Sequence, residues 1–278
     1  MRYAFSTLAC PEWSWERAIA AATSLAYQGI EWRLIDGSLV TADFPLETCR
    51  KIGARMRNER LESVALDTNI QLAVPAGEQR TRMIAEAHGM MERAYALGAP
   101  MLRVFIGEYP PGTSDATALQ WVAEGLDAFI GRARELSVTI ALEVHVFKGR
   151  GKNVNGTSDS SLCRQTVRNA GGRGIGILWD VGNPYEEGET FEETWAQVRD
   201  SLLYLHVKDA RCLPDGHWKY VLNGEGEIPL GSIVRLLHGH DFDGWFSYEW
   251  EKKWHPELAG PEVALPHYIS FMRALSEA

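Results

Sequence analysis

The chain has 278 residues, 45% of them hydrophobic, and a net charge of −9 from 28 basic and 37 acidic residues. This length and composition are typical of one large globular domain of the α/β-barrel kind or of two smaller domains. An acidic chain without a long Lys/Arg run is a poor candidate for binding nucleic acid or an anionic membrane surface. No stretch approaches the ~18 consecutive apolar residues of a membrane-spanning helix.

Strand-like and helix-like segments alternate from one end of the chain to the other. Short apolar runs predict strands at residues 2–7, 29–35, 63–68, 101–107, 138–146, 174–180, 202–210 and 245–251. Amphipathic segments predict helices at residues 14–27, 46–61, 78–99, 118–137, 160–170, 191–199, 228–240 and 261–275. Eight strand–helix pairs predict a single (β/α)8 TIM barrel over residues 1–278. The alternative is a doubly wound open sheet, but its nucleotide-binding glycine patterns are missing.

Several residues mark where the predicted helices begin, end or bend. Ser14 is a plausible N-cap of the first helix, and Ser158 or Asp159 caps the helix at 160–170. Gly98 closes the helix at 78–99. Pro266 is a possible kink in the last helix.

The cysteines indicate a reducing environment. They show no C-x-x-C spacing, so we expect reduced thiols in a cytoplasmic protein. The start, MRYAFSTLAC, lacks a sustained apolar stretch and reads as a first strand rather than as a signal peptide. The cysteines are Cys10, Cys49, Cys163 and Cys212.

Four predicted strands each carry a potential metal ligand near the carboxyl end. These ligands are Glu143, Asp180, His206 and Glu249. A charged group at the tip of a buried strand is costly unless it is paired or ligates something. Because the carboxyl ends of barrel strands form one face, we expect the four to converge. Three carboxylates and one imidazole favour Mn²⁺, Mg²⁺ or Co²⁺, with Zn²⁺ possible.

Alternation along a strand predicts further polar groups at this face. Residues i and i+2 point the same way, so His145 is expected beside Glu143, Lys208 beside His206, and Glu251 beside Glu249. Each ligand also has a simpler interpretation when taken alone. Asp180 could form an Asx-turn, and His206 could be a hydrogen-bonded core residue. Their joint occurrence on four successive strands favours a site.

At this point the sequence resembles a known family. The signals are GIEWR, LGAPMLRVF, LEVH, WDVGN, LHVKDAR and GEGEIPL…DGWFSYEWEKKWHPEL. They resemble the xylose-isomerase-like barrel superfamily, in particular its sugar phosphate isomerase/epimerase group. The resemblance covers essentially the whole chain. It implies that Glu143, Asp180, His206 and Glu249 hold one divalent metal, the set that the strand tips also select.

The resemblance implies an isomerase or epimerase of a sugar or related polyhydroxy carbonyl compound that acts through an enediolate. Glu143 and Glu249 are the expected acid and base, with His145 and Lys208 assisting. Asn183, Arg211, Arg103 and Glu31 are the expected substrate contacts. A metal-dependent dehydratase of the inosose or 3-dehydroshikimate type uses the same intermediate and is the alternative. A non-catalytic sugar-binding barrel is the alternative from another class. Homo-oligomerisation is possible.

One position departs from many relatives of this family. Ketose 3-epimerases and the endonuclease IV-like nucleases carry a His three residues after the strand-six Asp, where this chain has Asn183. An amide can bond a substrate hydroxyl but is a poor metal ligand. The departure argues against a multi-zinc nuclease site and weakens the assignment to the ketose 3-epimerases. Lys148, Arg150 and Lys152 in the loop KGRGK are expected to cover a small substrate.

We predict no cleavage of abasic-site DNA and no salt-sensitive duplex binding near physiological ionic strength. Duplex binding needs clustered cations that displace counterions, whereas this chain has a net charge of −9 and only one short basic loop. A gel-shift titration at two salt concentrations checks this. Sub-micromolar duplex binding, or incision at an abasic site, would move the nuclease interpretation ahead of the isomerase.

Overall fold

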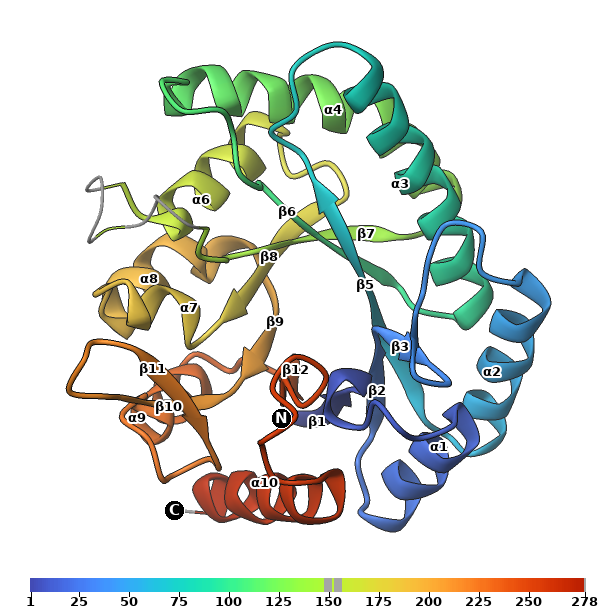
Figure 1. The fold of residues 1–278 in the computed structure, drawn as a ribbon, viewed down its shortest axis with the longest axis vertical. Helices are drawn as coiled ribbons and strands as arrows, with labels where there is room; N and C mark the ends of the chain where they lie inside the picture. The colour runs from blue at the N-terminus through green and yellow to red at the C-terminus, as the bar shows by residue number, and fades with distance from the viewer. Residues whose placement is uncertain (148–151, 153–156, 278) are drawn as a thin grey trace.

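The computed structural model describes residues 1–147, 152 and 157–277, in which parallel strands close into a barrel ringed by helices (Figure 1). The barrel strands are β1 (Arg2–Ser6), β2 (Gly29–Trp32), β5 (Glu62–Gln71), β6 (Met101–Phe105), β7 (Thr139–Glu143), β8 (Ile175–Asp180), β9 (Leu202–Val207) and β12 (Trp245–Tyr248). Their order around the barrel is β1-β12-β9-β8-β7-β6-β5-β2. These are the eight predicted strands, and the (β/α)8 barrel is confirmed.

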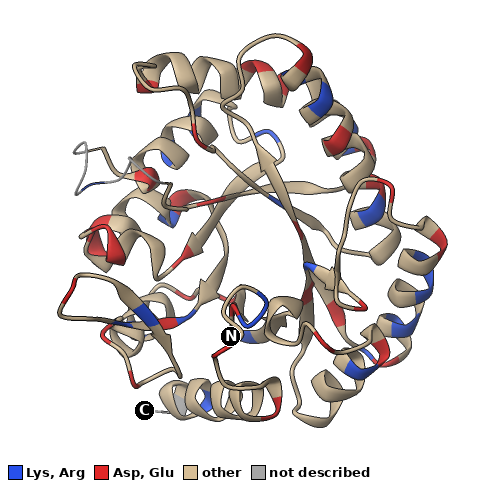
Figure 2. Cartoon of the chain, in the orientation of Figure 1, with Lys and Arg blue, Asp and Glu red and all other residues tan. Residues whose placement is uncertain are grey.

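The predicted helices are present on the outside of the barrel. They are α1 (Trp15–Ser24), α2 (Leu46–Asn58), α3 (Glu78–Leu97), α4 (Asp115–Glu135), α6 (Asp159–Asn169), α8 (Phe191–Val198), α9 (Leu230–Gly239) and α10 (Pro261–Glu277). Short additions are α7 (Asn183–Glu186) and the 3-10 turns η1 (Thr7–Ala9) and η2 (Arg199–Ser201). Acidic and basic residues are interspersed along the outer helices (Figure 2). Among the described helices, none combines the length and apolar composition needed to cross a bilayer.

The predicted helix ends agree with the structure. Ser14 accepts the backbone N–H of Arg17, and Ser158 rather than Asp159 is the N-cap of α6. Gly98 follows α3 with a left-handed φ of 72°, a conformation that glycine adopts without a steric penalty. Helix α10 passes through Pro266 without ending there.

Two predicted strands are interrupted where the chain leaves the barrel. The run 29–35 divides into β2 and β3 (Leu34–Ile35), which pairs with β4 (Ser38–Leu39). The backbone N–H groups of Arg33 and Leu34 donate to Thr7 Oγ1 instead of to a neighbouring strand. The run 202–210 divides after β9, and β10 (Asp209–Cys212) forms a hairpin with β11 (Trp218–Val221).

The barrel interior changes from apolar to charged along its axis. A separate apolar cluster fills its base, and a larger cluster lies between the strands and the helices. The cluster at the base comprises Ala4, Val64, Ala65, Met101, Ala141, Leu178, Tyr204 and Trp245. Two residues further along their strands, Ala141, Leu178 and Tyr204 are followed by Glu143, Asp180 and His206. Strand alternation therefore directs the ligands into the barrel, above its apolar base.

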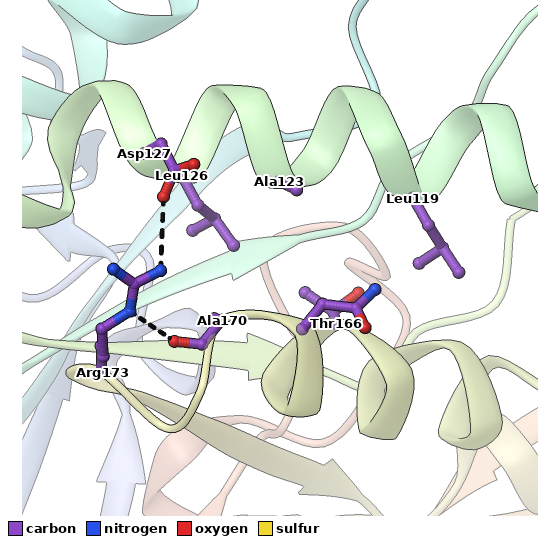
Figure 3. Close-up of a pocket in the computed structure, with 8 residues that line it drawn as sticks. Leu119, Ala123, Leu126, Asp127, Thr166, Ala170 and Arg173 are labelled. Carbon is purple, nitrogen blue, oxygen red and sulfur yellow. Dashed lines mark hydrogen bonds and ion pairs between the residues drawn. The ribbon is translucent and has the colours of Figure 1, made fainter.

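A hollow of about 40 Å³ lies on the outer layer of the molecule, between α4 and α6 (Figure 3). Leu119, Ala123, Leu126 and Thr166 line it. Arg173 closes one end, with NH2 3.6 Å from Asp127 Oδ1 and Nε donating to the Ala170 carbonyl at 2.8 Å. This small hollow is a packing gap between helices, bounded by an ion pair that is already satisfied.

Asp209 fastens the loop that follows the β10–β11 hairpin. Its carboxylate accepts the backbone N–H groups of Ala210, Gly224, Gly226 and Ile228 at 2.8–3.3 Å. A Cβ at Gly226 would lie 2.1 Å from Asp209 Oδ1, so the loop can approach only as glycine. The GEGE sequence and the Asp of HVKD thus form one structural unit.

We predict that Asp209→Ala lowers the free energy of unfolding by roughly 2–4 kcal/mol, because it leaves several backbone donors without an acceptor. Urea unfolding followed by circular dichroism measures the change. The control is Asp215→Ala on the same hairpin, where an exposed carboxylate accepts the N–H of His217. Equal stability of the two variants would contradict the role given to Asp209.

Candidate metal centre

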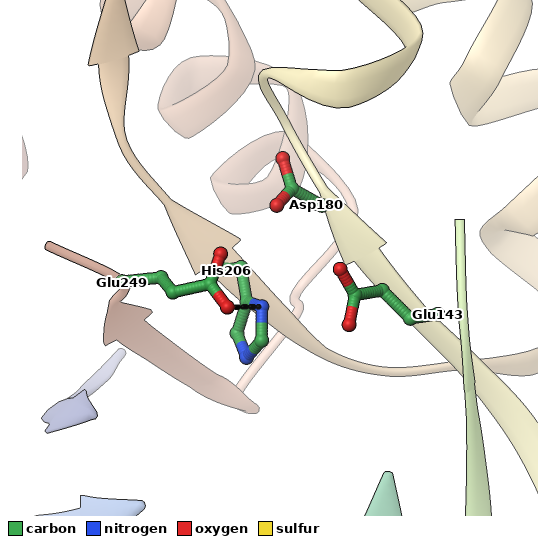
Figure 4. A group of neighbouring side chains, drawn as sticks. All are labelled: Glu143, Asp180, His206 and Glu249. Carbon is green, nitrogen blue, oxygen red and sulfur yellow. Dashed lines mark ion pairs between the residues drawn. The ribbon is translucent and has the colours of Figure 1, made fainter. Parts of the chain in front are cut away.

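The four predicted ligands lie together at the carboxyl end of the barrel (Figure 4). Glu143 and Asp180 end β7 and β8, His206 is in β9, and Glu249 follows β12. Strand register explains the convergence, since Asp180 is paired with His206, and His206 with Ser247, two residues before Glu249. One donor atom from each of the four lies within 4.8 Å of the others, and all four residues are buried.

The donor atoms of this group are of the kinds that bind a divalent cation. Glu143 Oε2, Asp180 Oδ2 and His206 Nδ1 are buried and point toward the centre of the group. Their nearest charged neighbours are Arg103 Nε at 3.3 Å, Lys208 Nζ at 2.7 Å and Glu249 Oε1 at 3.2 Å, respectively. Asp180 Oδ1 accepts the backbone N–H groups of Gly182 and Asn183 at 2.8 and 3.0 Å. Asp180 therefore forms the Asx-turn of the simpler interpretation with Oδ1, while its Oδ2 faces the centre and the ammonium of Lys208. Three carboxylates and one imidazole that meet at one buried point are a donor set that suits a divalent metal ion.

Lys208 balances the carboxylates at this end of the barrel. Its Nζ lies 2.7 Å from Asp180 Oδ2, 2.7 Å from Glu249 Oε2 and 2.8 Å from Glu251 Oε1. Burial opposes the charge of Lys208, but these carboxylates outweigh it and raise its pKa. Burial likewise opposes ionisation of Glu249, but the charges on His206 and Lys208 hold its pKa well below the usual range.

Glu31 lies beneath His206 rather than at the open end of the barrel. Its Oε1 is 2.8 Å from His206 Nε2 and accepts the hydroxyl of Tyr204 at 2.6 Å, and its Oε2 accepts that of Ser247 at 2.5 Å. Glu31 is completely buried. A carboxylate on the far nitrogen of a ligating imidazole fixes the ring and raises its basicity. The structure therefore gives Glu31 a supporting contact to a ligand.

Arg103 links the ligands to a carboxylate deeper in the barrel. Its Nε is 3.3 Å from Glu143 Oε2 and 3.6 Å from Asp67 Oδ1. Burial raises the pKa of Glu143 to about 8 despite the opposing charge of Arg103. Burial, with the charge of Glu31 added, raises the pKa of Asp67 to about 8. Glu31, Asp67 and His206 also form a second compact group of potential ligands, which shares the imidazole.

A cavity of about 260 Å³ has two of the four potential ligands, Glu143 and Glu249, in its wall. Its lining comprises Leu8, Arg33, Asn69, Gln71, Arg103, Phe105, Glu143, His145, Phe147, Glu249, Glu251 and Trp254. His145 packs between two aromatic rings, with centroid distances of 4.8 Å to Phe105 and 4.7 Å to Phe147. Burial, with the charges of Lys208 and Arg103 added, lowers the pKa of His145 to about 4. The cavity thus joins carboxylates, a neutral imidazole and cations to an aromatic wall.

Of the other residues predicted to contact the substrate, some lie near the ligands and some lie away from the cavity. Asn183 begins α7, and its Nδ2 lies 3.5 Å from Glu143 Oε1. Arg211 is an exposed residue of β10 and donates to the carbonyl of Glu225, outside the cavity lining. Lys152 Nζ lies 2.6 Å from Glu193 Oε2, while Lys148 and Arg150 fall outside the described residues.

Sequence reasoning missed two charged residues of the site. Asp67 ends the apolar run SVALD, so the strand-tip rule that selected the four ligands also applied to it. Arg33 lies two residues after Glu31, and the alternation rule placed it on the same face. Both signals were present in the sequence.

The fold and the centre together define a TIM barrel with a candidate divalent-metal site at its carboxyl end. Residues 19–275 match the xylose isomerase-like TIM barrel family, and the chain belongs to that family. No curated protein matches the chain.

Solved structures share the fold at low sequence identity. The IolI protein with a bound zinc atom has a TM-score of 0.76 and 16% identity, over 100% of this chain and 99% of its own. The 3-keto-D-glucoside 4-epimerase YcjR from E. coli has a TM-score of 0.74 and 14% identity, over 100% of both chains. The probable 3-DHS dehydratase AsbF from Bacillus anthracis has a TM-score of 0.74 and 14% identity, over 98% of this chain and 99% of its own.

We predict a graded loss of metal from this centre. Asp180→Ala or His206→Ala should abolish retention, because each leaves three of the four ligands. Glu31→Gln removes no ligand, and we expect it to weaken binding by about 10–100-fold by loosening His206. Elemental analysis after dialysis and metal titration measure the series, with exposed Glu257→Gln as the control. Full metal occupancy in both alanine variants would contradict the assignment of Asp180 and His206 as metal ligands.

Proposed function

We propose that the chain is a metal-dependent isomerase or epimerase of a sugar or related polyhydroxy carbonyl compound. The observation that carries this proposal is the group of four potential ligands, two of which, Glu143 and Glu249, line the wall of one cavity. Two carboxylates facing one cavity can remove a proton from a carbon and return it elsewhere. The sugar-modifying enzymes among the structural neighbours support this class of reaction.

Each residue of the site has its own role in the proposed reaction. Glu143, Asp180, His206 and Glu249 would hold the metal, which supplies charge stabilisation to a carbonyl oxygen and its neighbouring hydroxyl when bound. Either Glu143 or Glu249 takes the proton next to the carbonyl, and the other returns one to a different carbon or face. His145 and Lys208 bond substrate oxygens, and Asn183 keeps Glu143 oriented through its amide. The aromatic wall of Phe105 and Phe147 excludes water from the reacting carbons.

The donor set supports an oxygen-preferring ion, Mn²⁺, Mg²⁺ or Co²⁺. Three of the four ligands are carboxylates, which suits hard cations. Zinc is the other candidate, since an imidazole is present and IolI carries a zinc atom. The cysteines support a cytoplasmic location, because all four are free and three of them are buried.

A dehydratase is the second candidate function. The same enediolate loses water when a hydroxyl lies one carbon further along, and the fold is shared with the probable dehydratase AsbF. The two functions differ only in the fate of the intermediate. Incubating metal-loaded protein in D₂O with ketoses, inososes and keto-acids separates them, because NMR reads deuterium incorporation, rearrangement and loss of water. Binding without any exchange would favour the non-catalytic barrel.

We predict that Glu143→Gln and Glu249→Gln, each fully metallated, lower turnover by ~10²–10⁴-fold, the usual effect of removing a general acid or base. The amide keeps the size of the side chain but cannot exchange a proton. The rate of deuterium incorporation at matched metal occupancy is the measurement, with exposed Glu225→Gln as the control. A near wild-type rate of deuterium incorporation in either variant would mean that this Glu only binds the metal or takes no part in the reaction.

A further inference from the structure

Three cationic side chains are buried in the described part of the chain, namely Arg33, Arg103 and Lys208. Arg103 is paired with Asp67 and Glu143, and Lys208 with three carboxylates. Among the described residues, no carboxylate oxygen comes within ion-pair distance of Arg33, although the residue is only 4% exposed. Buried charges in proteins are normally paired, because desolvation is otherwise uncompensated. Arg33 is the exception in this structure.

Arg33 is held in place by neutral acceptors. Its NH1 donates to the backbone carbonyl of Asp67 at 3.2 Å, and its NH2 donates to Asn69 Oδ1 at 2.5 Å. The Asp67 carboxylate attracts Arg33 but is already paired with Arg103. Burial, with the charge of Arg103 added, lowers the pKa of Arg33 to about 10, so the side chain remains a cation at neutral pH. The protein fixes this guanidinium without neutralising it.

The position of Arg33 indicates what could neutralise it. Arg33, Asn69 and Gln71 line the same cavity as Glu143 and Glu249, so a molecule bound there can reach both the arginine and the candidate metal centre. A guanidinium has five N–H groups, and the two protein acceptors above leave others for a ligand. Carboxylates and phosphates bind this planar fork through two parallel hydrogen bonds.

We propose that the substrate carries an anionic group, a carboxylate or a phosphate, and that Arg33 binds it inside the cavity. The inference rests on the proposed function, because it concerns the substrate of that site. Arg211, an expected substrate contact, is exposed and lies outside the lining of this cavity.

Binding of matched compounds tests the inference. D-fructose and D-tagatose are compared by calorimetry with D-fructuronate and D-tagaturonate, in which the terminal alcohol is a carboxylate, and with their 6-phosphates. The protein is loaded with Mn²⁺. We expect one anionic series to bind about 10- to 100-fold more tightly than the neutral ketoses, as charge-assisted hydrogen bonds supply. The tighter series identifies the anion as carboxylate or phosphate.

Substitutions separate Arg33 from the metal as the source of this preference. Arg33→Gln should abolish it, Arg33→Lys should keep part of it, and exposed Arg235→Gln on α9 should leave it unchanged. Equal affinity of wild-type protein for neutral and anionic compounds would overturn the inference. So would an undiminished preference in Arg33→Gln, which would mean that another group binds the anion.

Thermal unfolding distinguishes a binding role from a structural one. Arg33→Gln should unfold at the wild-type temperature or above it, since it removes an unpaired buried charge. Arg103→Gln should unfold at a lower temperature, because it leaves Asp67 and Glu143 unpaired. Lower stability of Arg33→Gln, together with a retained anion preference, would make Arg33 structural and contradict the inference.

The result also separates this inference from the proposed function. Deuterium exchange that is equally fast for neutral and anionic compounds, and unchanged by Arg33→Gln in both series, would keep the isomerase and overturn the anionic substrate. The anionic compounds could instead bind in an Arg33-dependent way without exchanging any carbon-bound proton. That result would support the anion site and contradict the proposed isomerase function.

Discussion

The site depends on keeping an excess of negative charge inside a closed barrel. Five buried carboxylates gather there, on Glu31, Asp67, Glu143, Asp180 and Glu249, against three buried Lys and Arg side chains and the imidazole of His206. The low-polarity surroundings make each unbalanced charge costly. A divalent ion at the four candidate ligands would offset part of this negative charge. The pKa values of about 8 for Asp67 and Glu143 express the same excess.

Much of this arrangement follows from strand periodicity and could be predicted from the sequence. The alternation that directs Ala141, Leu178 and Tyr204 into the barrel base directs the next inward residue of each strand to the candidate centre. A parallel barrel brings these tips together, so Glu143, Asp180 and His206 converge without any motif being known. The eight strands and their helices were predictable for the same reason, because each apolar run and each cap is a local signal.

The remaining features depend on neighbours that are distant in sequence. Glu31 became a support for His206 because β2 and β9 face one another across the barrel interior, with their oxygen and nitrogen atoms 2.8 Å apart. Arg211 followed a ligand strand in sequence, yet the chain turns into a hairpin after β9 and carries it outward. Strand alternation places Arg33 on the face of Glu31, but its lack of a counter-ion can be seen only once the surrounding side chains are placed.

The HVKD segment shows why a sequence motif can identify the fold of a family without identifying the substrate. His206 and Lys208 face the candidate centre, whereas Asp209 points away and fastens the GEGE loop through four backbone N–H groups. Gly226 is required by that close approach and by nothing in the cavity. The residues free to select a substrate lie elsewhere on the wall, at Arg33 and Asn69 among others. Proteins can therefore share this barrel at about 14% identity while the chemistry of their ligands diverges, since fold and substrate choice are encoded by largely separate residues.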